Sequence, residues 1–88
     1  MRLIVAILHD TDGESALQAL TESGLGVTRI ASTGGFLRRG NSTLLIGVKA
    51  EEVPAAIQIL HEHCAPPVDP GFKRATVFVL KVDRFEQI

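Results

Sequence analysis

Four stretches of the chain carry the apolar runs typical of strands. Residues 2–8 form a nearly unbroken apolar run that ends in polar residues, which predicts a buried strand followed by a turn. Residues 27–33 and 43–48 are two further strand-like runs, separated by a glycine-containing loop at 34–41. We therefore expect these two strands to pair as a hairpin. Residues 75–82 form the fourth predicted strand.

Two other stretches place apolar residues at helical spacing. The first predicted helix follows the first strand and should end near Gly24. Thr11 and Glu14 have the spacing of a capping box at its start, and Asp12 is an alternative N-cap. The second predicted helix tolerates Pro54 because this residue falls near its first turn. The apolar positions are Ala16, Leu17 and Leu20 in the first helix and Val53, Ile57, Leu60 and Cys64 in the second.

The resulting order of elements is βαββαβ. This order is the split βαβ arrangement of the ferredoxin-like fold, which belongs to the α+β class. It predicts a four-stranded antiparallel sheet with both helices on one face. Because 88 residues leave room for one hydrophobic core, we expect a single domain over residues 1–88.

The predicted strands are apolar on both of their faces, although the helices should cover only one. A half-covered sheet normally alternates apolar and polar residues, and these strands do not. We therefore expect another copy of the chain to cover the helix-free face. The alternative is an open face with scattered exposed apolar residues. The residues concerned are Leu44, Leu45, Ile46 and Val48 in the third strand and Val77, Phe78, Val79 and Leu80 in the fourth.

Charge and cysteine content exclude several classes of function. The formal net charge of −1 provides no basic surface for general nucleic-acid binding and no polybasic membrane anchor. A single cysteine, Cys64, excludes an intrachain disulfide and suits a reducing compartment. The apolar run at the N-terminus is too short to span a bilayer and lacks a signal-peptide cleavage pattern. We therefore expect a cytoplasmic protein without nucleic-acid or membrane partners.

Residues 28–43 contain the most informative mixture of side chains. They combine hydroxyl groups, a Gly-Gly pair, arginines, Asn41 and an adjacent Phe36 and Leu37. Glycines let backbone N–H groups approach an anion closely, and arginine can bind phosphate through two hydrogen bonds. The carboxamide of Asn41 can read a base edge, and Phe36 or Leu37 can pack on a ring. The stretch predicts a nucleotide-like ligand, and the alternative is a long hairpin loop with no ligand.

Several blocks of the sequence also form a recognisable pattern together. They are Ala31–Leu37 (ASTGGFL), Gly40-Asn41, Gly47-Val48, Ala75–Val79 (ATVFV), Val82-Asp83 and Phe85. In these blocks, and in its opening strand, the chain resembles the P-II-like cyclic-di-AMP receptors along nearly its whole length.

This resemblance implies a non-catalytic signalling protein without a cofactor. It implies a homotrimer that holds cyclic-di-AMP, or a related nucleotide, at three equivalent interfaces between subunits. Gln87 would contribute from the same or a neighbouring subunit. The ligand contacts implied by the resemblance are Thr28, Gly35, Phe36, Leu37, Asn41, Gly47 and Gln87.

Two features depart from the pattern of this family. Only ten residues separate Cys64 from Ala75, where family members carry a long glycine-rich insertion. Residues 24–26 read Gly-Leu-Gly, where the family tends to have polar and basic side chains. These departures leave open an alternative function, a trimeric P-II-like interaction module that has lost cyclic-di-AMP binding or binds a different small ligand.

Other candidate sites have simpler explanations. His61 and His63 point about 200° apart on a helix, which argues against a metal cluster with Cys64. Residues 10–14 follow a strand and lack the later ligands of a calcium loop, so helix capping explains them better. No sequence pattern of a Ser-His-Asp or Cys-His catalytic site is present. We therefore expect neither a metal site nor an enzyme.

Overall fold

The computed structural model describes residues 1–31, 40–64 and 75–88. Strands and helices follow one another in the order predicted from the sequence, with one additional short 3-10 turn. The elements are β1 (Arg2–His9), α1 (Asp10–Glu22), β2 (Gly26–Ala31), β3 (Asn41–Val48), η1 (Ala50–Glu52), α2 (Val53–His63) and β4 (Ala75–Lys81).

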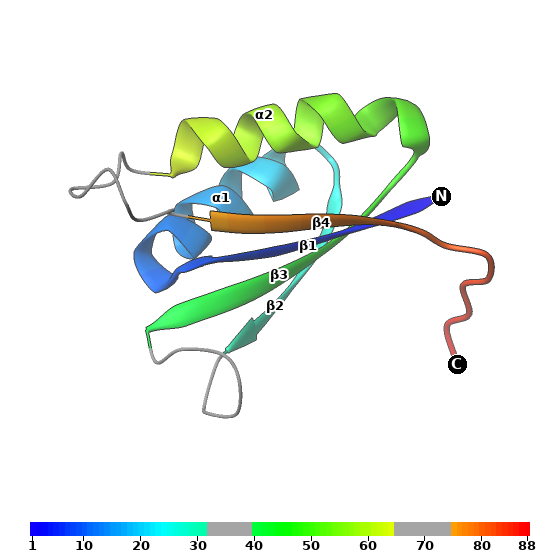
Figure 1. Cartoon of the computed structure of the whole chain (residues 1–88), viewed down its shortest axis with the longest axis horizontal. Helices are drawn as coiled ribbons and strands as arrows, with labels where there is room; N and C mark the ends of the chain where they lie inside the picture. Colours follow the sequence, from blue (N-terminus) through cyan, green and yellow to red (C-terminus); the bar gives the residue numbers. More distant parts are fainter. Residues whose placement is uncertain (32–39, 65–74) are drawn as a thin grey trace.

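The strands form one antiparallel sheet in the order β2-β3-β1-β4, and both helices lie on the same face of it (Figure 1). The central strands β1 and β3 pair over their full length, from Arg2 with Val48 to His9 with Asn41. The hairpin of β2 and β3 is confirmed. The chain therefore has the predicted ferredoxin-like α+β fold.

Helix α1 begins earlier than the predicted capping box. It starts at Asp10, and His9 occupies the N-cap position without a side-chain hydrogen bond to the helix. The backbone N–H of Asp10 donates instead to the carbonyl oxygen of Gly40 at 2.9 Å. The prediction of a cap at Thr11 or Asp12 was wrong, because the helix begins at Asp10 and the first of its free N–H groups is bonded to Gly40, the residue before β3.

Helix α2 matches the predicted span more closely. Pro54 lies in its first turn, where a missing N–H costs nothing. The preceding turn η1 is fixed by the side chain of Glu52, which accepts a hydrogen bond from the N–H of Lys49 at 2.8 Å. Cys64 has an extended backbone at the C-cap, just beyond the helix, and its side chain still packs against the hydrophobic core.

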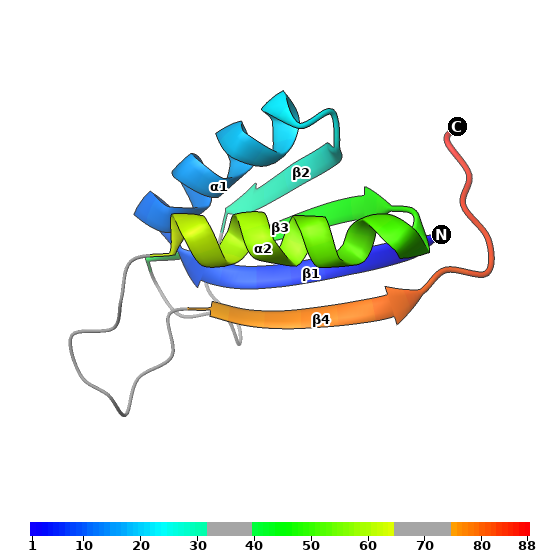
Figure 2. The same cartoon turned by 90° about the horizontal axis from the view of Figure 1, so that it is seen from above.

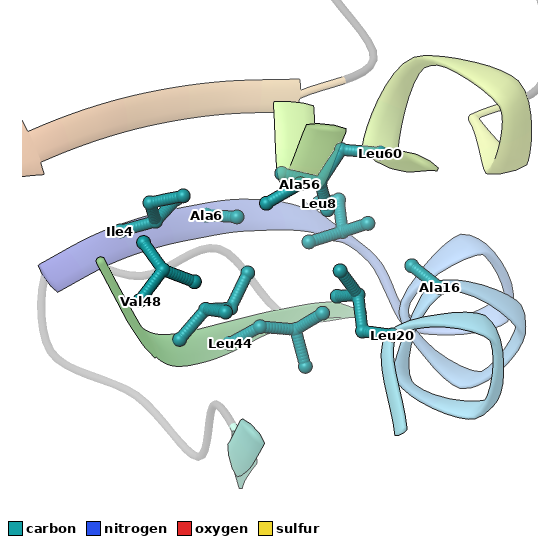
Figure 3. Close-up of a cluster of buried hydrophobic side chains, with 10 residues drawn as sticks. Ile4, Ala6, Leu8, Ala16, Leu20, Leu44, Val48, Ala56 and Leu60 are labelled. Carbon is teal, nitrogen blue, oxygen red and sulfur yellow. The ribbon is translucent and has the colours of Figure 1, made fainter. Parts of the chain in front are cut away.

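The hydrophobic core lies between the helices and the two central strands (Figure 3). Alternate residues of β1 and β3 point into it, while the intervening residues point to the opposite face of the sheet. Every one of the core side chains is at most 3% exposed. They are Ile4, Ala6, Leu8, Leu44, Ile46 and Val48 from the strands and Ala16, Leu20, Ala56 and Leu60 from the helices.

The edge strand β4 is exposed on both faces. Figure 2 shows it at the border of the sheet beside β1. Phe78 and Leu80 lie on the helix-free face, opposite Val5 and Leu3 of β1, and are 51% and 49% exposed. Val79 lies on the helix side and is still 44% exposed. The two-sided apolar pattern in the sequence therefore corresponds to real apolar surface on this strand.

Candidate functional site

The described candidate residues on strands share the helix-free face of the sheet. Leu44 and Ile46 are fully buried on the helix side of β3, so Asn41 and Gly47 must lie on the other side. Thr28 on β2 is paired with Leu45, which places its side chain on this same face. The structure thus brings Thr28, Asn41 and Gly47 to one surface of the β2–β3 hairpin.

These residues lie at opposite ends of that surface. Asn41 is paired with His9, where β1 ends, whereas Gly47 is paired with Leu3 near the start of β1. Gly47 follows Asn41 by six positions along β3, which corresponds to about 20 Å at about 3.3 Å per residue. Thr28 belongs to the half nearer Gly47, because its partner Leu45 is only two residues away. We call the Asn41 end and the Gly47 end of this surface the two half-sites.

The C-terminal tail lies near the Gly47 half-site. The N–H of Val82 donates to the carbonyl oxygen of Met1 at 3.2 Å, which fixes the start of the tail beside the N-terminus. Figure 1 shows the tail continuing from the end of β4, on the side away from the two helices. Gln87 is exposed in this tail. The tail that carries it therefore starts at the end of the sheet where Leu3 is paired with Gly47.

Three of the candidates, Gly35, Phe36 and Leu37, lie outside the described residues. The described strand ends show where the connecting segment leaves and rejoins the sheet. Strand β2 ends at Ala31 and strand β3 begins at Asn41, and Ala31 is paired with Ser42. Both attachment points therefore belong to the Asn41 half-site.

The helix side of the sheet carries a polar cluster that the sequence analysis did not predict. Arg29 donates hydrogen bonds to Ser42 Oγ from Nε at 3.2 Å and from Nη2 at 3.1 Å. Its Nη1 also forms an ion pair with Glu14 Oε2 at 2.6 Å. Ser42 Oγ in turn donates a short hydrogen bond to Asp10 Oδ1. We call Arg29, Ser42, Asp10 and Glu14 the hairpin clamp, because it joins both strands of the hairpin to α1.

The hairpin clamp corrects one part of the sequence interpretation. Arg29 was grouped with the residues that could bind an anionic ligand, yet its guanidinium group lies on the helix side, opposite Thr28. Its side chain is only 29% exposed and is engaged by Glu14 and Ser42. Arg29 therefore holds the hairpin in place, and residues 10–14, which we assigned to helix capping, supply its carboxylate partners.

His63, at the end of α2, contacts α1. His63 Nδ1 lies 2.6 Å from Ser15 Oγ, a contact that joins α2 to α1. Within the described residues, no three or more His, Cys, Asp or Glu side chains are grouped so that they could hold a metal ion. In the same part of the chain, no helix is both long enough and apolar enough to cross a membrane.

Comparison with known proteins identifies the family. The family model described as "Cyclic-di-AMP receptor" matches residues 1–66, three quarters of the chain. The chain belongs to the cyclic-di-AMP receptor family. The matched region includes both strands of the hairpin that carry Thr28, Asn41 and Gly47. The family match thus supports the interpretation of this chain as a P-II-like signalling receptor.

A solved structure of similar size has the same fold as this chain. It is the crystal structure of a functionally unknown protein from Pediococcus pentosaceus, with a TM-score of 0.78 and 32% sequence identity. The alignment covers 99% of this chain and 96% of that protein. Its similarity therefore extends beyond the region of the family match to β4 and the C-terminal tail.

Proposed function

We propose that the chain is a non-catalytic signalling protein that binds cyclic-di-AMP, or a related nucleotide, between the subunits of a homotrimer. The observation that carries this proposal is the separation of the candidate residues into two half-sites on one face. Membership of the receptor family provides the class of ligand.

The size of a ligand pocket supports a site shared between subunits. Pockets for small molecules have volumes of roughly 300–1,000 Å³, which corresponds to a width of about 7–10 Å. Asn41 and Gly47 are separated by about two to three times that width along one strand. One pocket can therefore use both only if it combines the Asn41 half-site of one copy with the Gly47 half-site of another.

The chemistry of the half-sites suits a nucleotide. The carboxamide of Asn41 can donate to and accept from the edge of a base, and the hydroxyl of Thr28 can bond to a sugar or phosphate oxygen. A carboxamide is not a general base, and a threonine hydroxyl acts as a nucleophile only when an adjacent base activates it. The Ser15–His63 contact lies on the helices, on the other side of the sheet from both half-sites. These features support binding without catalysis.

The apolar strands support the assembly. Phe78 and Leu80 are about half exposed on the helix-free face, and Ile30 on β2 is 44% exposed on the same face. Contact with neighbouring subunits would remove these side chains from water, and burial of a large apolar side chain contributes about 1.5–3 kcal/mol. The face that carries the half-sites is thus also the face that gains most from association.

Calorimetric titration of the intact chain tests the proposal. The panel should contain cyclic-di-AMP, other cyclic dinucleotides and linear adenine nucleotides, with light scattering on the same sample. We expect one ligand per subunit in a particle of about three chains, as closed cyclic symmetry requires. Absence of binding across the panel, or a monomer that binds, would contradict the proposal.

A second candidate function is supported by a specific feature of the sequence. The connection between Cys64 and Ala75 is ten residues long, and residues 24–26 carry no polar side chain. A trimeric interaction module that binds no nucleotide would be consistent with both features. The same titration separates the two functions, because this module would form a trimer and give no heat with any nucleotide.

A further inference from the structure

Asp10 is bonded to the residues on either side of Asn41. Its backbone N–H donates to the carbonyl oxygen of Gly40 at 2.9 Å, and its Oδ1 accepts the short hydrogen bond from Ser42 Oγ. Asn41 itself is paired with His9, the residue before Asp10. The junction of β1 and α1 therefore contacts three consecutive residues at the start of β3.

The sheet alone holds Asn41 from one side only. Strand β1 pairs with β3 as far as Asn41, whereas the pairing of β2 with β3 in the described part of the chain ends at Ala31 and Ser42. Gly40 has a φ of +89°, which lies outside the extended conformation of a strand. Asn41 is thus the end of a strand, where backbone pairing opens most easily unless another contact holds it.

The hairpin clamp lies directly behind this strand end, on the helix side of the sheet. Ser42 is fully buried and the side chain of Arg29 is 29% exposed, so their polar groups have lost most of their contact with water. Desolvation offsets much of the attraction in such a network, whereas its directional hydrogen bonds allow only one arrangement. The hairpin clamp is therefore suited to fixing the position of the strand end.

We propose that Asp10 is a positioning residue for nucleotide binding, which holds Asn41 where its carboxamide meets the ligand. This inference rests on the proposed function and deepens it. The carboxylate of Asp10 bonds to Ser42 on the helix side, whereas Asn41 faces the other side of the sheet. Asp10 thus acts through the backbone of β3 without touching the nucleotide. A side chain that is fixed before binding does not have to be immobilised by the ligand, and this raises the affinity.

Titration with cyclic-di-AMP tests this inference in Asp10→Ala and Glu14→Ala. Both substitutions remove a carboxylate that pairs with Arg29, at 3.8 Å for Asp10 and 2.6 Å for Glu14. Of the two, only the Asp10 carboxylate bonds to Ser42 in the described part of the chain. Asp10→Ala should weaken binding by roughly three- to tenfold, the effect of one more side chain that must be immobilised on binding. Glu14→Ala, the matched control, should bind within about twofold of the wild type.

Two further variants separate positioning from charge and from general stability. Asp10→Asn keeps a side-chain oxygen that can accept from Ser42, so it should bind within about twofold of the wild type. Asp10→Ala combined with Asn41→Ala should bind no more weakly than Asn41→Ala alone, because Asp10 acts through the missing carboxamide. Ser42→Ala removes the same hydrogen bond from its other partner and should weaken binding like Asp10→Ala, so the test does not depend on one variant folding.

The outcomes that contradict the inference are distinguishable. Wild-type affinity in both Asp10→Ala and Ser42→Ala would overturn the positioning role and leave the proposed function intact. Additive losses in the double variant would show that Asp10 affects binding by a route other than Asn41, which also overturns it. A wild-type chain that binds no nucleotide would overturn both the positioning role and the proposed function.

Discussion

Ser42 and Thr43 are adjacent hydroxyl residues that have different environments. The hydroxyl of Ser42 is the centre of the hairpin clamp, where it accepts from Arg29 and donates to Asp10. The hydroxyl of Thr43 lies on the other face of the sheet, is buried, and has no hydrogen-bond partner in the described part of the chain. One hydroxyl therefore stabilises the subunit and the other carries a desolvation cost.

This contrast gives a prediction for stability. Ser42→Ala should lower the free energy of unfolding by about 1–2 kcal/mol, because it leaves Arg29 and Asp10 without their shared partner. Thr43→Val keeps the shape of the side chain and removes an unpaired polar group, so it should be neutral or stabilise by up to about 1 kcal/mol. Urea unfolding of both variants measures the difference. A loss of stability in Thr43→Val would show that its hydroxyl gains a partner in the assembled protein.

Asn41 carries the second prediction at this scale. Asn41→Ala should weaken nucleotide binding by roughly ten- to a hundredfold, the usual effect of losing a hydrogen-bonding group in a desolvated site. The side chain is only partly buried, so the melting temperature should change little. Titration calorimetry measures the effect. Gln18→Ala is the control, because it removes an exposed carboxamide that donates to Glu22 on the surface of α1.

At the scale of elements, the sequence predicted the secondary structure well because the apolar periods are strong. Uninterrupted apolar runs in β1 and β3 indicated strands with high specificity. The start of α1 was predicted less well, since the capping pattern at Thr11 could not reveal that Gly40, thirty residues away from Asp10, binds the first turn. Contacts between distant segments override local signals of this kind.

The sequence of β2 could not predict which of its side chains lie on which face of the sheet. Val27, Thr28, Arg29 and Ile30 place one apolar and one polar residue on each face of the strand. Only the pairing of Thr28 with Leu45 decides that Arg29 points toward α1. For this reason the hairpin clamp was missed, and Arg29 was grouped with the ligand-binding candidates. Its pairing with Glu14 depends on the way the helix packs against the hairpin.

Strand β4 gives a prediction about assembly. Phe78→Lys places a charge on the helix-free face, where we expect contact between subunits, and should convert the trimer to a monomer. Burial of one large apolar side chain contributes about 1.5–3 kcal/mol, and the symmetry of a trimer repeats the loss at each interface. Val79→Lys introduces the same charge one residue away on the opposite face and should leave the trimer intact. Light scattering during gel filtration measures both masses, and equal behaviour of the two variants would contradict this orientation.

At the scale of the whole molecule, the arrangement of the sheet separates the two half-sites. Strand β3 is the element that holds them apart, with Asn41 at its first residue and Gly47 near its last. The C-terminal tail starts at the Gly47 end, and the attachment points of residues 32–39 belong to the Asn41 end. The sequence identified the candidate residues through their family pattern. It could not show that they divide into two groups, because this division depends on strand register and sheet order.

Mixed assembly of two defective variants tests the shared site most directly. Asn41→Ala damages one half-site and Thr28→Val damages the other, so each variant alone should bind cyclic-di-AMP weakly. The Asn41→Ala subunit keeps an intact Gly47 half-site, and the Thr28→Val subunit keeps an intact Asn41 half-site. If each ligand site combines half-sites from two subunits, every trimer that contains both variants must include a site with two intact halves. Random mixing in equal amounts should restore wild-type affinity at about a quarter of the sites, as expected for a head-to-tail cyclic interface. Calorimetric titration of co-expressed subunits measures this fraction, and a mixture that shows no binding at wild-type affinity would contradict a site built from two copies of the chain.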